Sequence, residues 1–155
     1  MNYHNPAKIY LQQYRAARVR YASMCREIEH WRESLTGTTV QLKDDVVSGG
    51  GVSDRMAATV AKIIDAQSQL ANEAAEVSKA LAAVLEAIRN VPDETQRTVL
   101  TLRYIEGLNW ITIAEKMNYS EARTYVIHGR ALISVNDWIK AEEKKREEKI
   151  VVKLL

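Results

Sequence analysis

The sequence predicts an all-α protein: a long antiparallel helical hairpin, coiled-coil-like, followed by a compact helix-turn-helix. Two long segments carry apolar residues at helical spacings of three and four, and a glycine-rich stretch separates them. A third segment, 91–135, holds shorter helical patterns divided by turn residues. We therefore expect a hairpin over 1–90 with its loop at 36–52, a helix-turn-helix domain over 91–138, and a tail over 139–155.

The first helix is expected from about Pro6 to Leu35. Its apolar positions recur in alternating steps of four and three residues, which is typical of a helix that packs along one stripe. The stripe consists of Tyr10, Tyr14, Ala17, Tyr21, Met24, Ile28, Trp31 and Leu35.

The second helix is expected from about Asp54 to Asn90, with Ser53 as its N-cap. Ten positions match a heptad seam, which indicates a continuous helix with a coiled-coil-like stripe. These positions are Met56, Val60, Ile63, Gln67, Leu70, Ala74, Val77, Leu81, Val84 and Ile88.

The segment between the two helices contains Gly37 and the run Ser48-Gly49-Gly50-Gly51. Glycine weakens a helix, so this stretch predicts a loop that lets the helices run antiparallel. A triple glycine is also found in phosphate-binding loops, but no Lys-Ser/Thr pair follows it and no strand precedes it. A flexible connection is the better interpretation.

The hairpin is a candidate oligomerisation arm. Its seam includes small and polar residues, which often set the register and the number of chains in a coiled coil. Two arrangements stay open, a homodimer through the hairpin and a monomer whose hairpin packs on the last domain. The residues expected to mediate pairing are Tyr14, Tyr21, Ile28, Val60, Ile63, Leu70, Val77 and Leu81.

Segment 91–138 divides into three short helical patterns. Pro92 fits the first turn of a helix that runs to Glu106, with Gly107 ending it. Asn109 is placed to cap a second helix, about Trp110 to Met117. Asn118 and Tyr119 form the turn, and Ser120 caps a third helix. The third helix has an apolar stripe at Thr124, Ile127, Ala131 and Val135.

These residues resemble region four of bacterial sigma factors. The matching positions are Val91-Pro92, Leu100-Thr-Leu-Arg-Tyr104, Gly107, Ile113-Ala114-Glu115, Met117, Tyr119-Ser120 and Arg130-Ala131-Leu132. With Ala61-Lys-Ile-Ile-Asp65 and His128-Gly-Arg-Ala-Leu132 included, the chain is similar to small phage and prophage transcription regulators that carry this module. The resemblance covers the C-terminal third specifically and residues 54–90 more loosely. It implies a DNA-binding activator that acts with host RNA polymerase.

The expected exposed face of the third helix departs from that family. At about 100° per residue, the side opposite the apolar stripe presents Ala122, Tyr125, Val126 and Gly129 instead of polar, base-reading side chains. Two interpretations stay open. Small residues could let the helix sit deep in the major groove, with Val126 and Ala122 meeting thymine methyl groups, or the face could bind protein.

The flanking residues favour DNA, because long cations at the edges of an exposed helix face reach phosphates. Glu121 can instead serve the helix dipole, and His128 is more typical of a packed or phosphate-proximal side chain than of a metal ligand. The candidate DNA-binding residues are Thr112, Lys116, Ser120, Glu121, Ala122, Arg123, Tyr125, Val126, His128 and Arg130.

Charge is distributed unevenly along the chain. The net charge of the 155 residues is +2. Residues 1–35 carry six basic and three acidic groups, a balance of +3, whereas 91–135 carries five of each. A neutral DNA-binding module implies weak binding on its own, because phosphate neutralisation supplies most of the sequence-independent affinity.

Several classes of protein are excluded by composition. No apolar run reaches the roughly 18–20 residues that span a bilayer, and the start lacks an apolar signal-peptide core, so we expect a protein of the bacterial cytoplasm without membrane partners. A single cysteine, Cys25, excludes an internal disulfide and a multi-cysteine metal site. No paired carboxylates or Ser/His/Asp set has workable spacing, so we expect neither an enzyme nor a cofactor.

The tail over 139–155 is expected to be a charged extension of the last helix with an apolar terminus, Ile150 to Leu155. That terminus could be a docking peptide, a packing strand or a frayed end.

The function expected from the sequence is a sequence-specific DNA-binding regulator of phage or prophage genes, an activator working with RNA polymerase, and a homodimer. Two alternatives stay open. One is a small subunit of a phage DNA-packaging terminase, which would also join a helix-turn-helix to an oligomerising segment. The other is an interaction module that binds polymerase without touching DNA.

Overall fold

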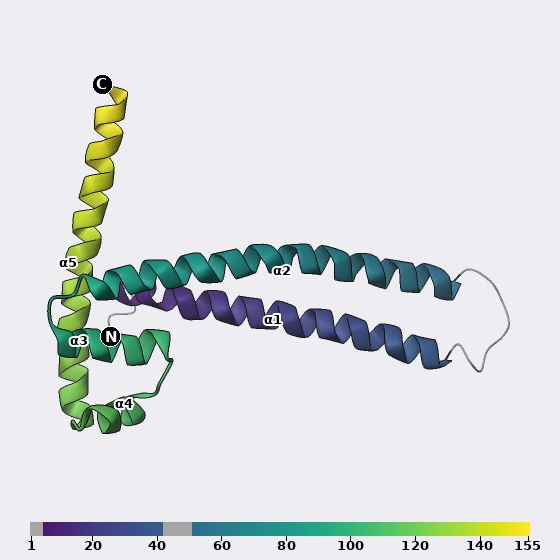
Figure 1. Ribbon diagram of the computed structural model, residues 1–155, viewed down its shortest axis with the longest axis horizontal. Helices are drawn as coiled ribbons and strands as arrows, with labels where there is room; N and C mark the ends of the chain where they lie inside the picture. Colours follow the sequence, from purple (N-terminus) through teal and green to yellow (C-terminus); the bar gives the residue numbers. More distant parts are fainter. Residues whose placement is uncertain (1–4, 42–50) are drawn as a thin grey trace. The chain divides into compact units, whose positions relative to one another are not determined.

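The computed structural model describes residues 5–41 and 51–155, and this part of the chain is helical with no strand. The helices are α1 (Pro6–Gln41), α2 (Gly51–Arg89), α3 (Glu94–Leu100), α4 (Trp110–Met117) and α5 (Glu121–Leu154). A π-helical turn, η1 (Thr101–Ile105), follows α3 directly. The all-α prediction is confirmed for the described residues (Figure 1).

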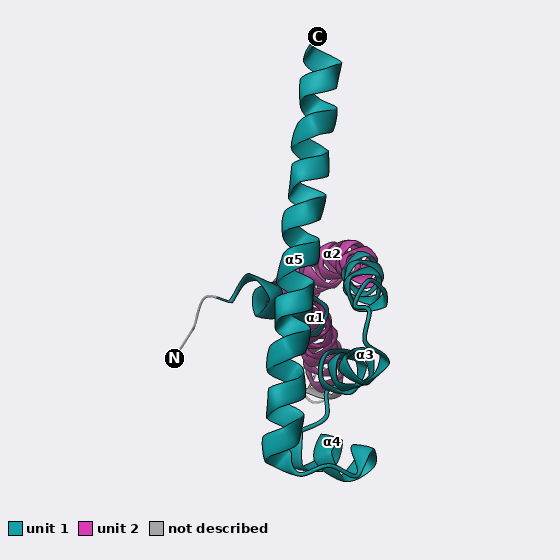
Figure 2. Cartoon of the chain, turned by 90° about the vertical axis from the view of Figure 1, so that its left-hand side faces the viewer, with its two compact units in different colours: residues 1–16, 79–155 teal, residues 17–78 magenta. Residues whose placement is uncertain are grey.

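The chain divides into two compact units. One comprises residues 1–16 and 79–155, and the other comprises residues 17–78 (Figure 2). The three functional domains expected from the sequence, with boundaries at residues 90 and 138, stay a prediction.

Within residues 17–78, α1 and α2 lie side by side and run antiparallel (Figure 1). Arg20 Nε lies 3.4 Å from Glu73 Oε2, and further along α1 the Lys62 ammonium lies 4.5 Å from the Trp31 ring centre. The residue number of the contact in α2 decreases, from 73 to 62, as the residue number in α1 increases from 20 to 31, so the two helices are antiparallel. Arg20 is exposed and Glu73 is half-buried, so solvent still screens the ion pair and it adds only about 0–1 kcal/mol.

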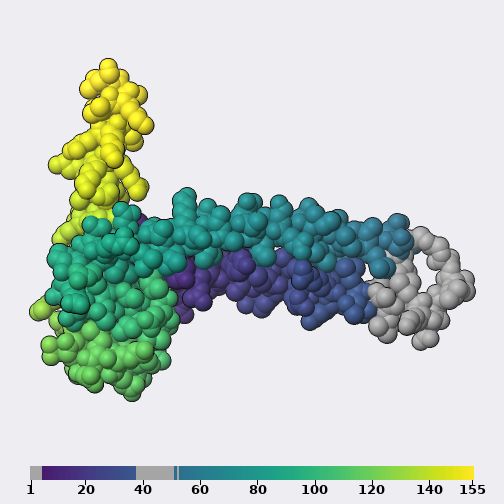
Figure 3. Space-filling view, viewed as in Figure 1, coloured from purple at the N-terminus to yellow at the C-terminus, as the bar shows by residue number. Residues whose placement is uncertain are grey.

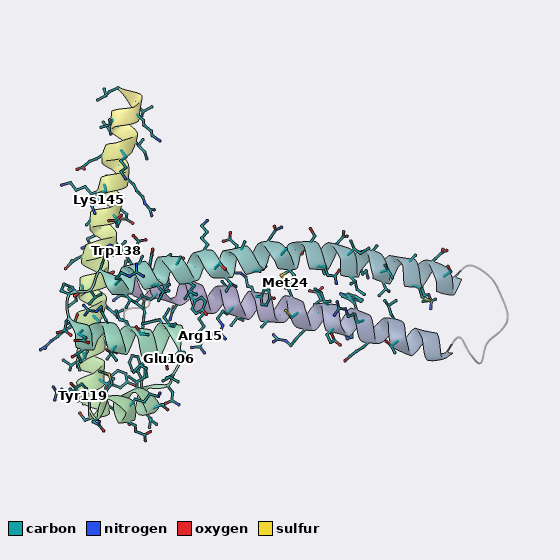
Figure 4. The ribbon with its side chains drawn as sticks, viewed as in Figure 1. Arg15, Met24, Glu106, Tyr119, Trp138 and Lys145 are labelled. Carbon is teal, nitrogen blue, oxygen red and sulfur yellow. The ribbon has the colours of Figure 1, made fainter. Side chains whose placement is uncertain are left out.

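The inward stripe of α1 in this unit agrees with the sequence analysis. Ala17 and Ile28 are buried, and Met24 and Trp31 are half-buried. Figure 4 labels Met24 on the side of α1 that faces α2. Each of these residues belongs to the predicted four-and-three pattern.

The inward stripe of α2 runs in a different register from the one predicted. Ile63 is buried and Leu70 and Val77 are half-buried, as expected. Val60, in contrast, is 43% exposed, and Gln67 and Ala74 are exposed as well. Their inward places are taken by three half-buried residues, Thr59, Ala66 and Glu73.

The predicted and the observed inward stripes of α2 share every second position, such as Ile63, Leu70 and Val77. The prediction is therefore wrong only at the positions between them. An amphipathic stripe can step three then four residues, or four then three, from the same anchors. Val60 is more apolar than Thr59, and apolarity therefore favoured the wrong order. The predicted inward orientation of Val60, Gln67 and Ala74 is incorrect.

The ends of the two long helices also differ from the prediction. α1 continues beyond Leu35 through Gly37 to Gln41, and α2 begins at Gly51. Ser53 consequently lies inside α2 and is not its N-cap. A single glycine costs a helix only about 1 kcal/mol, which a long helix tolerates. Residues 42–50 of the predicted loop lie outside the described residues.

The other unit has a single hydrophobic core, in which Tyr10 and Trp138 make an edge-on ring contact at 5.7 Å. The N-terminal turn of α1 contributes Ala7 and Leu11, both of which are fully buried although neither belongs to the predicted stripe. The core consists of Ala7, Leu11, Val84, Ala87, Ile88, Val91, Leu100, Tyr104, Ala131, Leu132 and Val135.

The C-terminal part of α5 extends beyond this core, where no other described residue covers it in the view of Figure 3. Lys145 Nζ binds Glu142 Oε1 at 2.8 Å, one turn apart, and Val152 and Leu154 are 72% and 81% exposed. α5 continues to Leu154, so the terminus is helical and its interpretation as a strand is incorrect. None of the described helices is both long and apolar enough to cross a membrane.

Candidate functional site

The first helical segment of the site begins at an aspartate cap. Asp93 Oδ1 accepts a hydrogen bond from the Gln96 amide at 2.8 Å, so Pro92 lies before the cap and not in the first turn. The predicted single helix from 93 to 106 is instead α3 followed by η1. The sequence carries no separate signal for this wider turn, in which the Glu106 amide binds the Thr101 carbonyl at 3.0 Å.

The caps of α4 agree with the sequence analysis. Asn109 Oδ1 accepts from the Thr112 amide at 2.9 Å, which satisfies one of the free amides at the start of the helix. Asn118 adopts the left-handed conformation, with φ of 55°, and the next amide, Tyr119, binds the Ala114 carbonyl at 3.0 Å. The chain therefore turns out of α4 in the way that commonly ends helices.

α5 starts immediately after this turn. Ser120 Oγ accepts from the Arg123 amide at 3.2 Å, as predicted for its cap. Thr124 and Val135 are fully buried, which confirms the inward stripe of this helix. The short turn and the two caps thus fix which side of α5 faces outward.

The outward side of α5, which we call the α5 face, is a band of small and apolar residues. Val126 and Ile133 are 53% and 61% exposed, and Ile133 extends the band beyond the predicted residues. Tyr125 is 48% exposed and lies against Trp110 of α4, with ring centres 4.8 Å apart. The α5 face comprises Ala122, Tyr125, Val126, Gly129 and Ile133.

Two arginines follow one edge of this band. At about 100° per residue, Arg123 and Arg130 lie on the side away from Tyr125. Both are exposed, and the Arg123 guanidinium lies 4.0 Å from the ring centre of Tyr119, which Figure 4 labels beside the α4–α5 turn. A cation held over an aromatic ring is preorganised, so it loses less freedom on binding an anion.

Gly129 is expected to weaken α5, and no neighbouring atom of the described chain requires a glycine at this position. A methyl group added at Gly129 would meet nothing within 4 Å, so Gly129→Ala is expected to raise the free energy of unfolding by about 0.5–1 kcal/mol. Gly107 is the matched comparison, because its φ of 73° disfavours any side chain. Gly107→Ala is expected to lower that free energy by about 1–2 kcal/mol. Urea titration of both variants measures the two changes in the free energy of unfolding. Changes of the same sign would contradict the backbone conformations described for these two glycines.

His128 does not belong to the exposed face. It is 6% exposed, its Nε2 lies 2.9 Å from the Tyr104 hydroxyl, and its ring meets Trp110 edge-on at 4.7 Å. Burial, helped by the charges of Lys8 and Arg103, lowers the pKa of His128 to about 4. His128 is therefore a core residue and not part of the exposed surface, contrary to its predicted contact with DNA.

Tyr104, the partner of His128, is buried as well. Burial raises the pKa of its hydroxyl to about 12, so the pair is neutral over the whole ordinary pH range. A neutral, mutually hydrogen-bonded pair is the usual solution for buried polar side chains, and its role here is to join η1 to α5.

The other predicted contact residues surround the α5 face unevenly. Lys116, Ser120 and Glu121 are exposed, whereas Thr112 is half-buried in the first turn of α4. Arg103 was not predicted to belong to the site, yet its guanidinium lies 4.8 Å from the centre of the Trp110 ring and donates to the Leu108 carbonyl at 2.9 Å. No pattern in the sequence marks that contact, because it depends on η1.

Among the described residues, no group of three His, Cys, Asp or Glu side chains could hold a metal ion. What the described site presents is a surface: a helix face with an apolar band, arginines along one edge and a tyrosine on the other.

The fold and this surface define an all-helical protein with a short capped turn between α4 and α5. The family described as "Protein of unknown function (DUF1492)" matches residues 37–136, and the chain belongs to this family. No curated protein and no solved structure matches the chain.

Proposed function

We propose that this protein binds double-stranded DNA through the α5 face and regulates transcription of phage or prophage genes, as an activator working with host RNA polymerase. The observation that carries the proposal is the exposed start of α5, fixed by a capped turn after α4 and edged by Arg123 and Arg130. A helix presented in this way fits the width of the major groove.

The arrangement of charge supports a division of labour within the α5 face. Arginines at the edge of a helix reach phosphate oxygens, while the band between them and Tyr125 meets base edges. Ala122 and Val126 are suited to thymine methyl groups, which are the apolar feature of the major groove. Exposed acidic groups at Glu115 and Glu121 offset part of the positive charge, so binding by one chain is expected to be weak.

Removing both edge arginines is the direct test. The double variant Arg123→Ala, Arg130→Ala is expected to bind a random-sequence DNA duplex about tenfold more weakly at low salt, because two phosphate contacts are lost. The slope of log affinity against log salt is expected to fall by about 2. Fluorescence anisotropy of a labelled duplex, over a salt series, gives both quantities.

A matched control removes the same charge from the same helix. Lys144→Ala with Arg146→Ala lies in the exposed C-terminal part of α5, away from the α5 face, and is expected to keep the wild-type slope. If both double variants lose affinity equally, the effect is one of net charge, and the α5 face is not the DNA contact.

A second candidate function is a module that binds RNA polymerase without contacting DNA. The exposure of Ile133 and of Ile111, 61% and 57%, favours it, since apolar side chains of this size are typical of protein interfaces. Co-purification with polymerase at a salt concentration that abolishes all DNA binding would support this candidate, and salt-sensitive DNA binding that depends on Arg123 would exclude it.

A further inference from the structure

One long face of α2 carries no charge although it is exposed. Every residue of this face is solvent-exposed, and its two large apolar members, Val60 and Ile64, are 43% and 60% exposed. The residues follow one another at steps of three and four, as a packing seam does. The face, which we call the α2 face, comprises Ala57, Val60, Ile64, Gln67, Ala71, Ala74 and Ser78.

The charged residues of the same stretch lie on the opposite side of the helix. Between Met56 and Ser78 they are Lys62, Asp65, Glu73 and Glu76, of which Glu73 borders the inward stripe and pairs with Arg20 of α1. At about 100° per residue, all four fall within about 40° of the direction opposite Val60. The inward stripe, with Ile63 and Leu70, lies between the two faces. A solvated helix of a two-helix hairpin would carry charge on its whole outer surface, and α2 carries it on only one side.

We propose that the α2 face binds the α2 face of a second copy of this chain, with the two helices antiparallel. The distribution of side-chain sizes favours this occupant. Val60 and Ile64 stand in the first half of the face, and Ala71 and Ala74 stand in the second half. Antiparallel pairing therefore places Val60 opposite the second copy's Ala74 and Ile64 opposite its Ala71, so large residues meet small ones.

Polar residues complement this pairing at its centre and its ends. Gln67 falls on the two-fold axis, where its amide can exchange hydrogen bonds with the same residue of the second copy. A single polar residue in an apolar seam fixes the register of helix pairs. Asp54 and Lys79 lie beyond the two ends of the face and on one flank of α2, about 120° and 100° around the helix from Val60. Antiparallel pairing brings this flank of the two copies side by side, so at each end Asp54 of one copy lies nearest to Lys79 of the other.

Parallel pairing and nucleic acid fit this surface less well. In a parallel pair, Ile64 would meet Ile64 and Ala71 would meet Ala71, which leaves gaps between the small residues, and Asp54 would lie far from Lys79. DNA requires cations, and the α2 face has none. Of the oligomerisation residues predicted from the sequence, only Val60 belongs to this surface, since Ile28, Ile63, Leu70 and Val77 pack within the chain's own unit 17–78.

The first test is the mass of the full chain in solution without DNA. Light scattering after gel filtration is expected to return twice 17.6 kDa for the wild type at micromolar concentration. Ile64→Glu is expected to return 17.6 kDa with unchanged helical circular dichroism, because the side chain is exposed within the chain. Ala58→Glu adds the same charge to the exposed, charged side of α2 and is expected to stay dimeric. A monomeric wild type, or dimers of all three proteins, would overturn the proposal.

The second test is the direction of pairing, read by disulfide formation in a Cys25→Ser background. Gln67→Cys is expected to cross-link, because the axis brings this position against itself. Ile64→Cys is expected not to, because antiparallel pairing separates the two copies of this position by about 10 Å along the helices. Cross-linking of Ile64→Cys, or none at either position, would rule out this arrangement.

Discussion

Leu11→Ala is expected to lower the free energy of unfolding by about 2–5 kcal/mol. Leu11 is fully buried in the core that also contains Val84, Leu100 and Val135. Shortening this side chain removes apolar contacts and leaves a cavity, which the surrounding helices fill only in part by moving inward. Urea titration followed by circular dichroism gives the change.

Ile9→Ala is the matched control for Leu11→Ala. Ile9 stands two positions away in the same helix and is 57% exposed, so its truncation is expected to change stability by less than about 0.5 kcal/mol. Equal losses in both variants would mean that the first turns of α1 are not packed as described.

Acidification from pH 6.5 to pH 4 is expected to remove up to about 3 kcal/mol of stability through His128 alone. A histidine in an unfolded chain has a pKa near 6.5, whereas burial lowers the pKa of His128 in the folded protein to about 4. Over this range the unfolded chain binds a proton that the folded protein does not, so stability is full above pH 6.5 and falls as the pH falls. Each pH unit corresponds to about 1.4 kcal/mol. Urea titrations at a series of pH values measure the slope.

Carboxyl groups titrate in the same range, so the His128 contribution is read as a difference between proteins. His128→Gln keeps a hydrogen-bonding partner for Tyr104 but has no proton to gain, and its slope between pH 4 and 6.5 is expected to be shallower than that of the wild type. His30→Gln is the matched control, since it removes a histidine that lies exposed on α1. If His128→Gln and the wild type lose stability in parallel, the histidine is not held neutral by the fold.

The parts of the structure that the sequence predicts best are those set by neighbouring residues. Asn109 and Ser120 cap the helices that follow them because a short polar side chain reaches an amide three residues away, and this depends on nothing distant. Gly107 and the inward stripe of α1 are predictable for the same kind of reason. Local chemistry therefore located the turn between α4 and α5 to the residue.

The parts that the sequence could not predict depend on long-range packing. Thr59 faces inward in place of Val60. Which of the two faces inward depends on how α2 packs against α1, and the residues of α2 alone do not determine this. Leu11 lies beside the predicted stripe and is buried by residues more than 70 positions away. His128 shares a helix face with Thr124 and Ala131, but its hydroxyl partner, Tyr104, is positioned by a π-helical turn that has no sequence signal.

The candidate site was predicted in part. The exposure of Tyr125, Val126 and the two edge arginines follows from helical periodicity, once the inward stripe is known. The place of Ile133 in the band and the contact of Trp110 with Tyr125 were not predicted, because the contact joins α4 to α5 and depends on how the two helices pack. DNA binding, its sequence preference and its role in transcription stay predictions, which the arginine variants test.

Two backbone conformations bracket α4. Gly107 and Asn118 are the residues with positive φ in the described chain, and they stand on either side of this eight-residue helix. A helix of that length does not persist by itself in water. α4 is therefore expected to open as a unit that exchanges its amide hydrogens ahead of α5, and Tyr125 would lose its aromatic support each time it did so. The rigidity of the α5 face therefore depends on α4. A ligand that covers both helices would slow the amide hydrogen exchange of α4 more than that of α5.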